Sequence, residues 1–150
     1  MVKKAVLLFL FLLMVSSFTY AKEKCSISGH VTFSGQEDIY LGIYTIENFP
    51  QYKKSLPPEP FVKRIKPNAE QIKAGRLSFT FSGIPKGTYC IIAFQDVDNN
   101  GMLTCDTWGQ IEEVICSYKE SGVVDFSAAN WNNVKFELDK DISGITMKLD

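Results

Sequence analysis

The stretch TYCIIAFQ, from Thr88 to Gln95, limits what this chain can fold into more than any other. Successive side chains of a β-strand point to opposite faces of the sheet, and here both faces are apolar. One face carries Tyr89, Ile91 and Ala93, and the other carries Cys90, Ile92 and Phe94. A strand of this kind must be central in its sheet and covered on both sides.

The other segments that fit strands are short. In some of them apolar and polar residues alternate, and others are rich in β-branched and aromatic residues. These segments cover residues 25–33, 39–46, 61–66, 77–81, 112–118, 134–138 and 142–149. Turn-forming residues separate them, as in 34–38, 83–87 and 139–141, and the polar residues 67–75 fit one helical turn. About seven short antiparallel strands without one convincing amphipathic helix predict an all-β fold, a β-sandwich.

A proline-rich segment interrupts this series of strands. Between residues 47 and 60 lie Pro50, Pro57, Pro58 and Pro60, which cannot donate to a β-ladder. A linker between two domains is one explanation, but the ~25 residues before it are too few to form a core alone. We therefore expect a long surface loop within one domain that spans residues 22–150.

The first 21 residues have the pattern of a secretory signal peptide. Lys3 and Lys4 precede an apolar run from Ala5 to Val15, and small residues lead to Ala21, the expected cleavage site. An uncleaved membrane anchor is the alternative, but this run is shorter than the ~20 residues that a spanning helix needs. The chain is therefore expected in the periplasm or outside the cell. Its net charge of −1 falls further when Lys3 and Lys4 are removed, which argues against nucleic-acid partners.

The four cysteines all follow the expected cleavage site. An even number of cysteines in an exported chain predicts disulfides, here in one of three pairings. We favour Cys105 with Cys116, which would close the loop region, and Cys25 with Cys90, which would tie the first strand to the central one. A zinc site is disfavoured because there is no CxxC pair and only one histidine, His30.

The most informative functional pattern follows the central strand. In DVDNNGMLTCDT, oxygen-bearing side chains recur at positions one, three, five, nine and eleven, with Gly101 at position six. These side chains belong to Asp96, Asp98, Asn100, Thr104 and Asp106. The spacing matches the first half of an EF-hand calcium loop, in which the backbone carbonyl after the glycine, here that of Met102, adds a further oxygen.

The end of this pattern departs from a calcium loop. Position twelve is Thr107 instead of a bidentate glutamate, and a strand precedes the loop instead of a helix. Either Glu112 or Glu113 folding back would supply further oxygens. The alternative is a loop without metal, in which Asp and Asn cap their own backbone. We predict a Ca²⁺ site of modest affinity, with a Kd of ~10⁻⁴ to 10⁻³ M.

These motifs also resemble a known family. FSGIPKGTY, from Phe81 to Tyr89, followed by the apolar strand and the acidic loop, resembles a family of small secreted bacterial proteins of unknown function. Its domain is similar to transthyretin-like (prealbumin-like) and carboxypeptidase-regulatory-like β-sandwiches. Gly109 and Glu113 fall where that family has a glycine and a glutamate, whereas Ile111 replaces its proline. The resemblance implies a prealbumin-like sandwich and no assigned enzyme activity.

Catalytic patterns are weak in this sequence. His30 has no serine in a nucleophile-elbow context to accompany it, and Glu112 and Glu113 are adjacent, so on a strand they would point to opposite faces. We therefore expect a non-enzymatic binding or structural module that contacts an unknown protein or glycan partner. The alternative is a carbohydrate-binding module that uses Trp108 and Trp131 as an aromatic platform.

Overall fold

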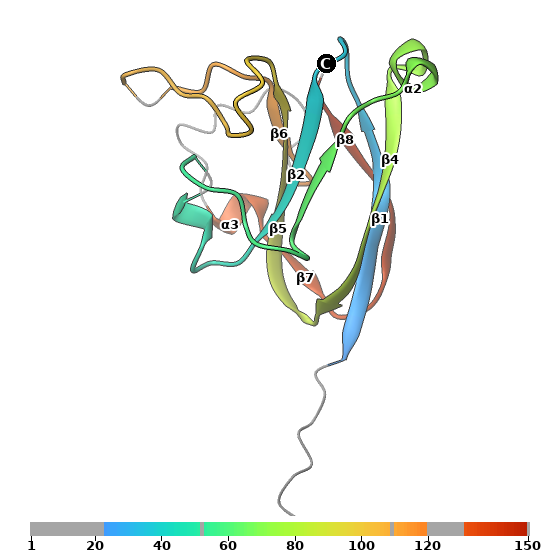
Figure 1. The fold of residues 1–150 in the computed structure, drawn as a ribbon. Helices are drawn as coiled ribbons and strands as arrows, with labels where there is room; N and C mark the ends of the chain where they lie inside the picture. Colours follow the sequence, from blue (N-terminus) through green and yellow to red (C-terminus); the bar gives the residue numbers. More distant parts are fainter. Residues whose placement is uncertain (1–22, 52, 109, 120–130, 150) are drawn as a thin grey trace, which may run out of the picture.

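Two β-sheets packed face to face form the body of the molecule in a computed structural model (Figure 1). The structure describes residues 23–51, 53–108, 110–119 and 131–149. The predicted signal peptide, residues 1–21, lies outside these ranges. No helix in the described ranges is long and apolar enough to cross a membrane.

The described residues form eight strands. They are β1 (Lys24–Thr32), β2 (Asp38–Tyr44), β3 (Val62–Ile65), β4 (Arg76–Pro85), β5 (Gly87–Asp96), β6 (Ile115–Ser117), β7 (Phe136–Leu138) and β8 (Ile142–Lys148). One sheet has the order β4-β1-β8, and the other has the order β3-β2-β5-β6, with β7 also paired to β5. The prediction of an all-β sandwich is confirmed. The pair β1 and β8 is parallel, which departs from the all-antiparallel expectation.

Alternating side chains from both sheets fill the space between them. The larger cluster of buried residues includes Ile27, Val31, Phe79, Phe81, Ile145 and Met147 from the three-stranded sheet and Ile39, Leu41, Ile43, Ile91 and Ala93 from the other. Ala93 and Ile91 are fully buried there. Burial of apolar surface of this extent is the main source of the stability of such a fold.

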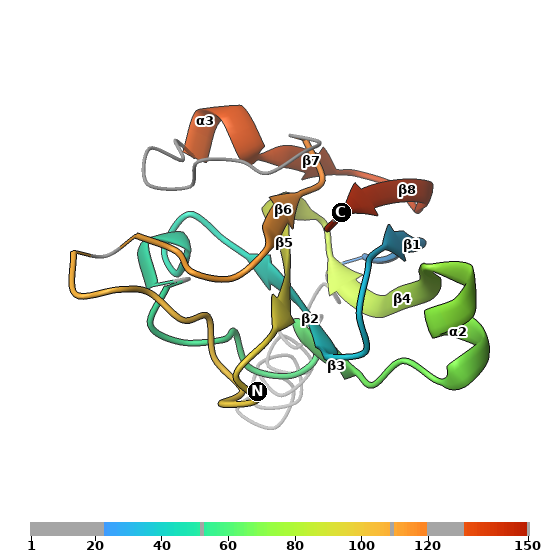
Figure 2. The same cartoon turned by 90° about the horizontal axis from the view of Figure 1, so that it is seen from above.

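A second cluster covers the opposite face of the five-stranded sheet. It consists of Tyr40, Tyr44, Cys90, Ile92, Phe94 and Ile115 from the sheet, with Phe49, Leu103 and Val134 from the connecting segments. Figures 1 and 2 show these segments on the side of the five-stranded sheet that faces away from β1, β4 and β8. The prediction that the central strand is buried on both faces is confirmed, and the proline-rich excursion helps to bury it.

Short helices lie at the connections. They are the 3₁₀ helix η2 (Phe49–Gln51), α2 (Ala69–Ala74) and α3 (Trp131–Val134). Asn68 and Gln71 form a capping box at the start of α2, and Gly75, in the left-handed region, ends it. The single helical turn expected within residues 67–75 is thus present.

Both predicted disulfides are absent, because the cysteines point into different parts of the fold. All four lie in the described ranges and none is joined to another by a disulfide. Cys25 points into the core between the sheets, whereas Cys90 points into the cluster on the other face of the five-stranded sheet. Likewise Cys116 is in the core between the sheets, whereas Cys105 lies in the loop and forms a β-bridge with Ile111.

Candidate functional site

The acidic loop leaves the sheet where β5 ends, at Asp96, and returns to it at β6. The chain turns through two left-handed residues, Asn99 at φ 58° and Gly101 at φ 77°. A Cβ built at Gly101 would also lie 3.3 Å from the hydroxyl of Tyr40. Glycine is favoured here because it tolerates this backbone conformation without steric cost.

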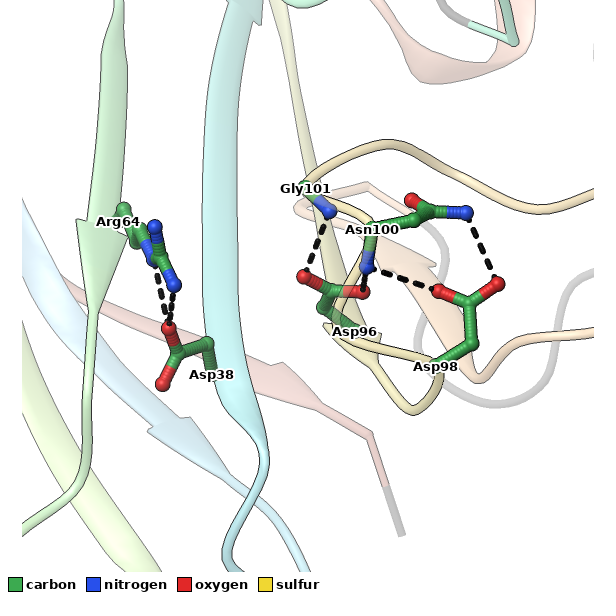
Figure 3. Close-up of polar contacts among 6 residues, drawn as sticks. All are labelled: Asp38, Arg64, Asp96, Asp98, Asn100 and Gly101. Atoms are coloured by element: carbon green, nitrogen blue, oxygen red, sulfur yellow. Dashed lines mark hydrogen bonds and ion pairs between the residues drawn. The ribbon is translucent and has the colours of Figure 1, made fainter.

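Asp96 is fully buried and holds the turn together. Its Oδ1 accepts a hydrogen bond from the backbone N–H of Asn100 at 3.1 Å, and its Oδ2 accepts one from that of Gly101 at 3.0 Å (Figure 3). Charge-assisted hydrogen bonds of this kind are stronger than neutral ones. The last residue of the central strand therefore fixes the shape of the loop.

Asp98 lies on the exposed side of the same turn. Its Oδ1 accepts from the Asn100 N–H at 3.1 Å, and its Oδ2 accepts from Asn100 Nδ2 and the Thr104 hydroxyl, each at 2.8 Å. The hydrogen bond from Thr104 is the main cause that lowers the pKa of Asp98. Asp98 is therefore held in its charged form.

Glu113 comes from the far end of the loop and joins both ends of the turn. Its Oε1 accepts from the Val97 N–H at 2.8 Å, and its Oε2 accepts from the Thr104 N–H at 2.9 Å. Burial raises the pKa of Glu113, and the nearby charges of Asp96 and Asp98 raise it further, although the two backbone hydrogen bonds act in the opposite direction. Glu113 is 8% exposed.

These three carboxylates form one cluster. Asp96, Asp98 and Glu113 each offer an oxygen atom, and these oxygens all lie within 4.8 Å of one another. The salt bridges found among the described residues, Arg64 with Asp38 and Lys86 with Glu23, do not include them. Three carboxylates at this separation repel one another, and a bound cation would relieve the repulsion.

The structure brings together only part of the predicted ligand set. Asp96 and Asp98 are in the cluster, and Thr104 touches it through its hydroxyl. Asn100 directs its amide nitrogen to Asp98 and accepts the Met102 N–H on its Oδ1 at 2.7 Å. Asp106 turns toward its own backbone instead, where its Oδ1 accepts from the N–H groups of Trp108 and Gln110.

Glu113 was not part of the predicted ligand set. The sequence held two signals for it. The family resemblance implies a glutamate at its position, and a fold-back of Glu112 or Glu113 would supply further oxygens. Only the folded loop distinguishes the two, because Glu113 is buried against the turn while Glu112 is exposed.

A third buried carboxylate, that of Asp38, lies beside the cluster but has its own cation. Asp38 on β2 stands directly opposite Asp96 on β5. Its Oδ2 accepts from Arg64 Nε at 2.6 Å and lies 2.6 Å from another guanidinium nitrogen of Arg64. Figure 3 shows Asp38 directed to Arg64 and Asp96 directed to the loop. The two carboxylates therefore serve different partners.

The two tryptophans occupy different environments. Trp108 is 87% exposed. Trp131, at the start of α3, packs against Phe49 in an edge-to-face arrangement with ring centroids 5.4 Å apart. It is partly buried against the second hydrophobic cluster. Trp131 thus has a structural partner, and Trp108 has the exposed ring that a binding platform requires.

The fold and the loop together define a class: a two-sheet β-sandwich with a carboxylate cluster at the rim of its central strand. The chain belongs to the bacterial family described as "Uncharacterized protein conserved in bacteria (DUF2141)", whose model matches residues 26–145. That range begins within β1, ends within β8 and contains the cluster and Trp108. No curated protein and no solved structure matches the chain.

Proposed function

We propose that this chain is an exported, non-enzymatic β-sandwich module of the transthyretin-like kind that binds Ca²⁺ through Asp96, Asp98 and Glu113. The observation that carries the proposal is the convergence of three carboxylates, from both ends of one loop, to within 4.8 Å. Hydrogen bonds to the loop backbone hold each of the three carboxylates. These bonds leave the repulsion among three neighbouring carboxylates uncompensated.

The chemistry of the cluster suits a hard cation. Calcium takes six to eight oxygen ligands at ~2.3–2.6 Å and accepts irregular geometry. Each carboxylate oxygen has two acceptor positions, so the oxygens of Asp96 and Glu113 and the Oδ1 of Asp98, which each accept one N–H, retain one for the ion. The three carboxylates supply part of the coordination shell, and water would supply the rest. Affinity should therefore be modest, with a Kd of ~10⁻⁴ to 10⁻³ M.

Thermal denaturation in a calcium titration tests this proposal. An ion with a Kd of ~1 mM stabilises the protein by about 1.4 kcal/mol at ~10 mM, which raises Tm by a few degrees. Asp98→Asn keeps the side-chain shape and should abolish the increase. Asp106→Asn is the matched control, because Asp106 belongs to the same loop but bonds to its own backbone. No increase in the wild type, or an equal loss in both variants, would contradict the proposal.

The partner of the module is a protein or a glycan in the periplasm or outside the cell. A carbohydrate-binding module is the second candidate function, and one observation favours it: the 87% exposure of Trp108, in the same loop as the carboxylate cluster. The platform of Trp108 and Trp131 that the sequence suggests is less favoured, because Trp131 packs against Phe49.

A further inference from the structure

A short β-hairpin begins and ends next to the carboxylate cluster. Thr104 donates its N–H to Glu113, and its carbonyl accepts the N–H of Glu112 at 3.0 Å. The next residue, Cys105, forms an antiparallel bridge with Ile111. Residues 104–108 and 110–112 are called the tip hairpin below.

Hydrogen bonds continue from this stem to the tip. The N–H of Asp106 donates to the carbonyl of Gln110 at 2.8 Å, and Asp106 Oδ1 accepts from Trp108 N–H at 2.8 Å and Gln110 N–H at 2.7 Å. A continuous ladder therefore joins the cluster to Trp108. Figures 1 and 2 both show this segment, between β5 and β6, extending away from the two sheets.

The ring that this hairpin presents is the most exposed large apolar side chain among the described residues. Five large apolar side chains are exposed in the described ranges: Trp108, at 87%, and Ile46, Val97, Met102 and Ile72. Three of the five, Val97, Met102 and Trp108, belong to the acidic loop or its hairpin. An exposed tryptophan held by a hydrogen-bonded backbone is suited to binding, since its burial by a partner removes a large apolar area from water.

The surroundings of Trp108 indicate the chemistry of the partner. Its exposed neighbours Thr107 and Gln110 are uncharged and can both donate and accept hydrogen bonds. The exposed acids Asp98 and Glu112 stand at the base of the hairpin and would repel an anionic polymer. Asp106 adds a carboxylate at the tip, but its Oδ1 is engaged by the backbone N–H groups of Trp108 and Gln110. An apolar ring in a segment with neutral hydrogen-bonding side chains fits a sugar ring, which offers an apolar C–H face and hydroxyl groups at its edge.

We propose that the tip hairpin docks the module on a neutral polysaccharide, with Trp108 stacked on a sugar ring and Thr107 and Gln110 bonded to hydroxyls. A projecting ring can reach the surface of an insoluble polymer, which a recessed one cannot. The proposal also couples polysaccharide binding to cation binding, and in that respect it rests on the proposed function. The hydrogen bond from Thr104 to Glu113 joins the cluster to the hairpin stem, so an ion that orders the cluster also orders the stem.

Co-sedimentation of the full mature chain with insoluble cellulose, chitin and xylan tests the docking. Wild type with 5 mM Ca²⁺ should bind at least one of these polymers. Trp108→Ala should lower the association constant at least tenfold, and Trp108→Phe should recover part of the loss. Ile46→Ala, which removes an exposed apolar side chain elsewhere, is the matched control and should bind as wild type does.

The outcomes separate this inference from the proposed function. If wild type binds none of the three polymers, or if Trp108→Ala binds as well as wild type, the docking proposal is overturned, whether or not calcium raises Tm. If EDTA and Asp98→Asn leave polymer binding unchanged, the coupling is overturned and the docking stands. Retention of the calcium-induced increase in Tm by Trp108→Ala would show that the variant is folded and that the cation site is intact.

Discussion

Carboxylate oxygens of Asp96 and Glu113 lie within 4.8 Å of each other, although one residue ends the central strand and the other closes the loop that follows it. Both side chains are buried. Each accepts two backbone N–H groups of the loop, so each helps to define the turn. Their proximity adds a repulsion that the hydrogen bonds of the loop do not require, and this repulsion is the basis of the cation-binding proposal.

The first prediction concerns the pH dependence of stability. Because the pKa of Glu113 is raised above its ordinary 4.5, the folded state holds this proton more tightly than the unfolded chain. Its contribution to the free energy of unfolding is present below pH 4.5 and is lost as pH rises through the raised pKa. Asp98 has a lowered pKa, so its contribution to the free energy of unfolding is present above pH 3.8 and is lost only as the pH falls below that value.

Urea denaturation between pH 4 and 7, without calcium, measures this effect. The Glu113→Gln variant should be less stable than wild type overall, since one backbone N–H loses its acceptor at a cost of about 1–3 kcal/mol. The loss of stability with rising pH should nevertheless be smaller in the variant. Parallel pH profiles of wild type and variant would refute the assignment. In the presence of calcium the wild-type profile should reverse, because the ion binds the ionised carboxylate.

The second prediction concerns Arg64. Its guanidinium is the ion-pair partner of Asp38, whose side chain is only 7% exposed. Arg64→Ala leaves that carboxylate buried without its cation and should lower the free energy of unfolding, although by less than the loss of a fully buried pair because the Arg64 side chain is 61% exposed. Chemical denaturation measures it. The double variant Arg64→Ala, Asp38→Asn should recover part of the loss, and no recovery would contradict the pairing.

The third prediction concerns the parallel pairing of β1 and β8. A Cβ added at Gly29 would lie 2.2 Å from the carbonyl oxygen of Ile145, so the two strands would have to separate. Gly29→Ala should therefore cost about 3 kcal/mol. Gly144→Ala is the comparison, because that site is open and only its φ of +76° opposes a side chain, at a cost of about 1–2 kcal/mol. Equal losses in urea denaturation would argue against this pairing.

The fourth prediction concerns the cysteines. Cys25, Cys90 and Cys116 are buried as thiols, and burial raises the pKa of Cys90 to about 12. Cys105 is partly exposed. A thiol reagent at pH 8 should modify Cys105 first in the native protein and all four after unfolding in guanidinium without reductant. Fewer than four reactive thiols in the unfolded protein would reveal a disulfide and contradict the structure.

Much of the fold could be predicted from the sequence because local patterns determine it. Alternation in 77–81 and 142–149 and the two apolar faces of 88–95 correspond to β4, β8 and β5. The parallel contact of β1 with β8 could not be predicted this way, since alternation gives the face of a strand and not its neighbour or direction. The prediction of two disulfides was wrong for a related reason, because an even number of cysteines does not show on which side of a sheet each thiol lies.

The candidate site was predictable in part. Asp96 and Asp98 follow from spacing within one turn, which is a local property. The separation of Asp106 from them was not predictable, because Asp106 caps the tip hairpin, and that hairpin depends on the bridge between Cys105 and Ile111. The position of Glu113 beside Asp96 depends on how the loop folds back, so the sequence held only two indirect signals for it: the family resemblance and the expected fold-back of Glu112 or Glu113.

Amide chemical shifts in a calcium titration test the central claim most directly. Four backbone N–H groups donate to the clustered carboxylates: those of Asn100, Gly101, Val97 and Thr104. In a ¹⁵N-labelled protein these four signals should move together and saturate with one Kd of ~10⁻⁴ to 10⁻³ M, while amides of β1 and β4 remain in place. If the four signals do not move at 10 mM Ca²⁺, or if the largest changes occur elsewhere in the chain, the ion does not bind at Asp96, Asp98 and Glu113.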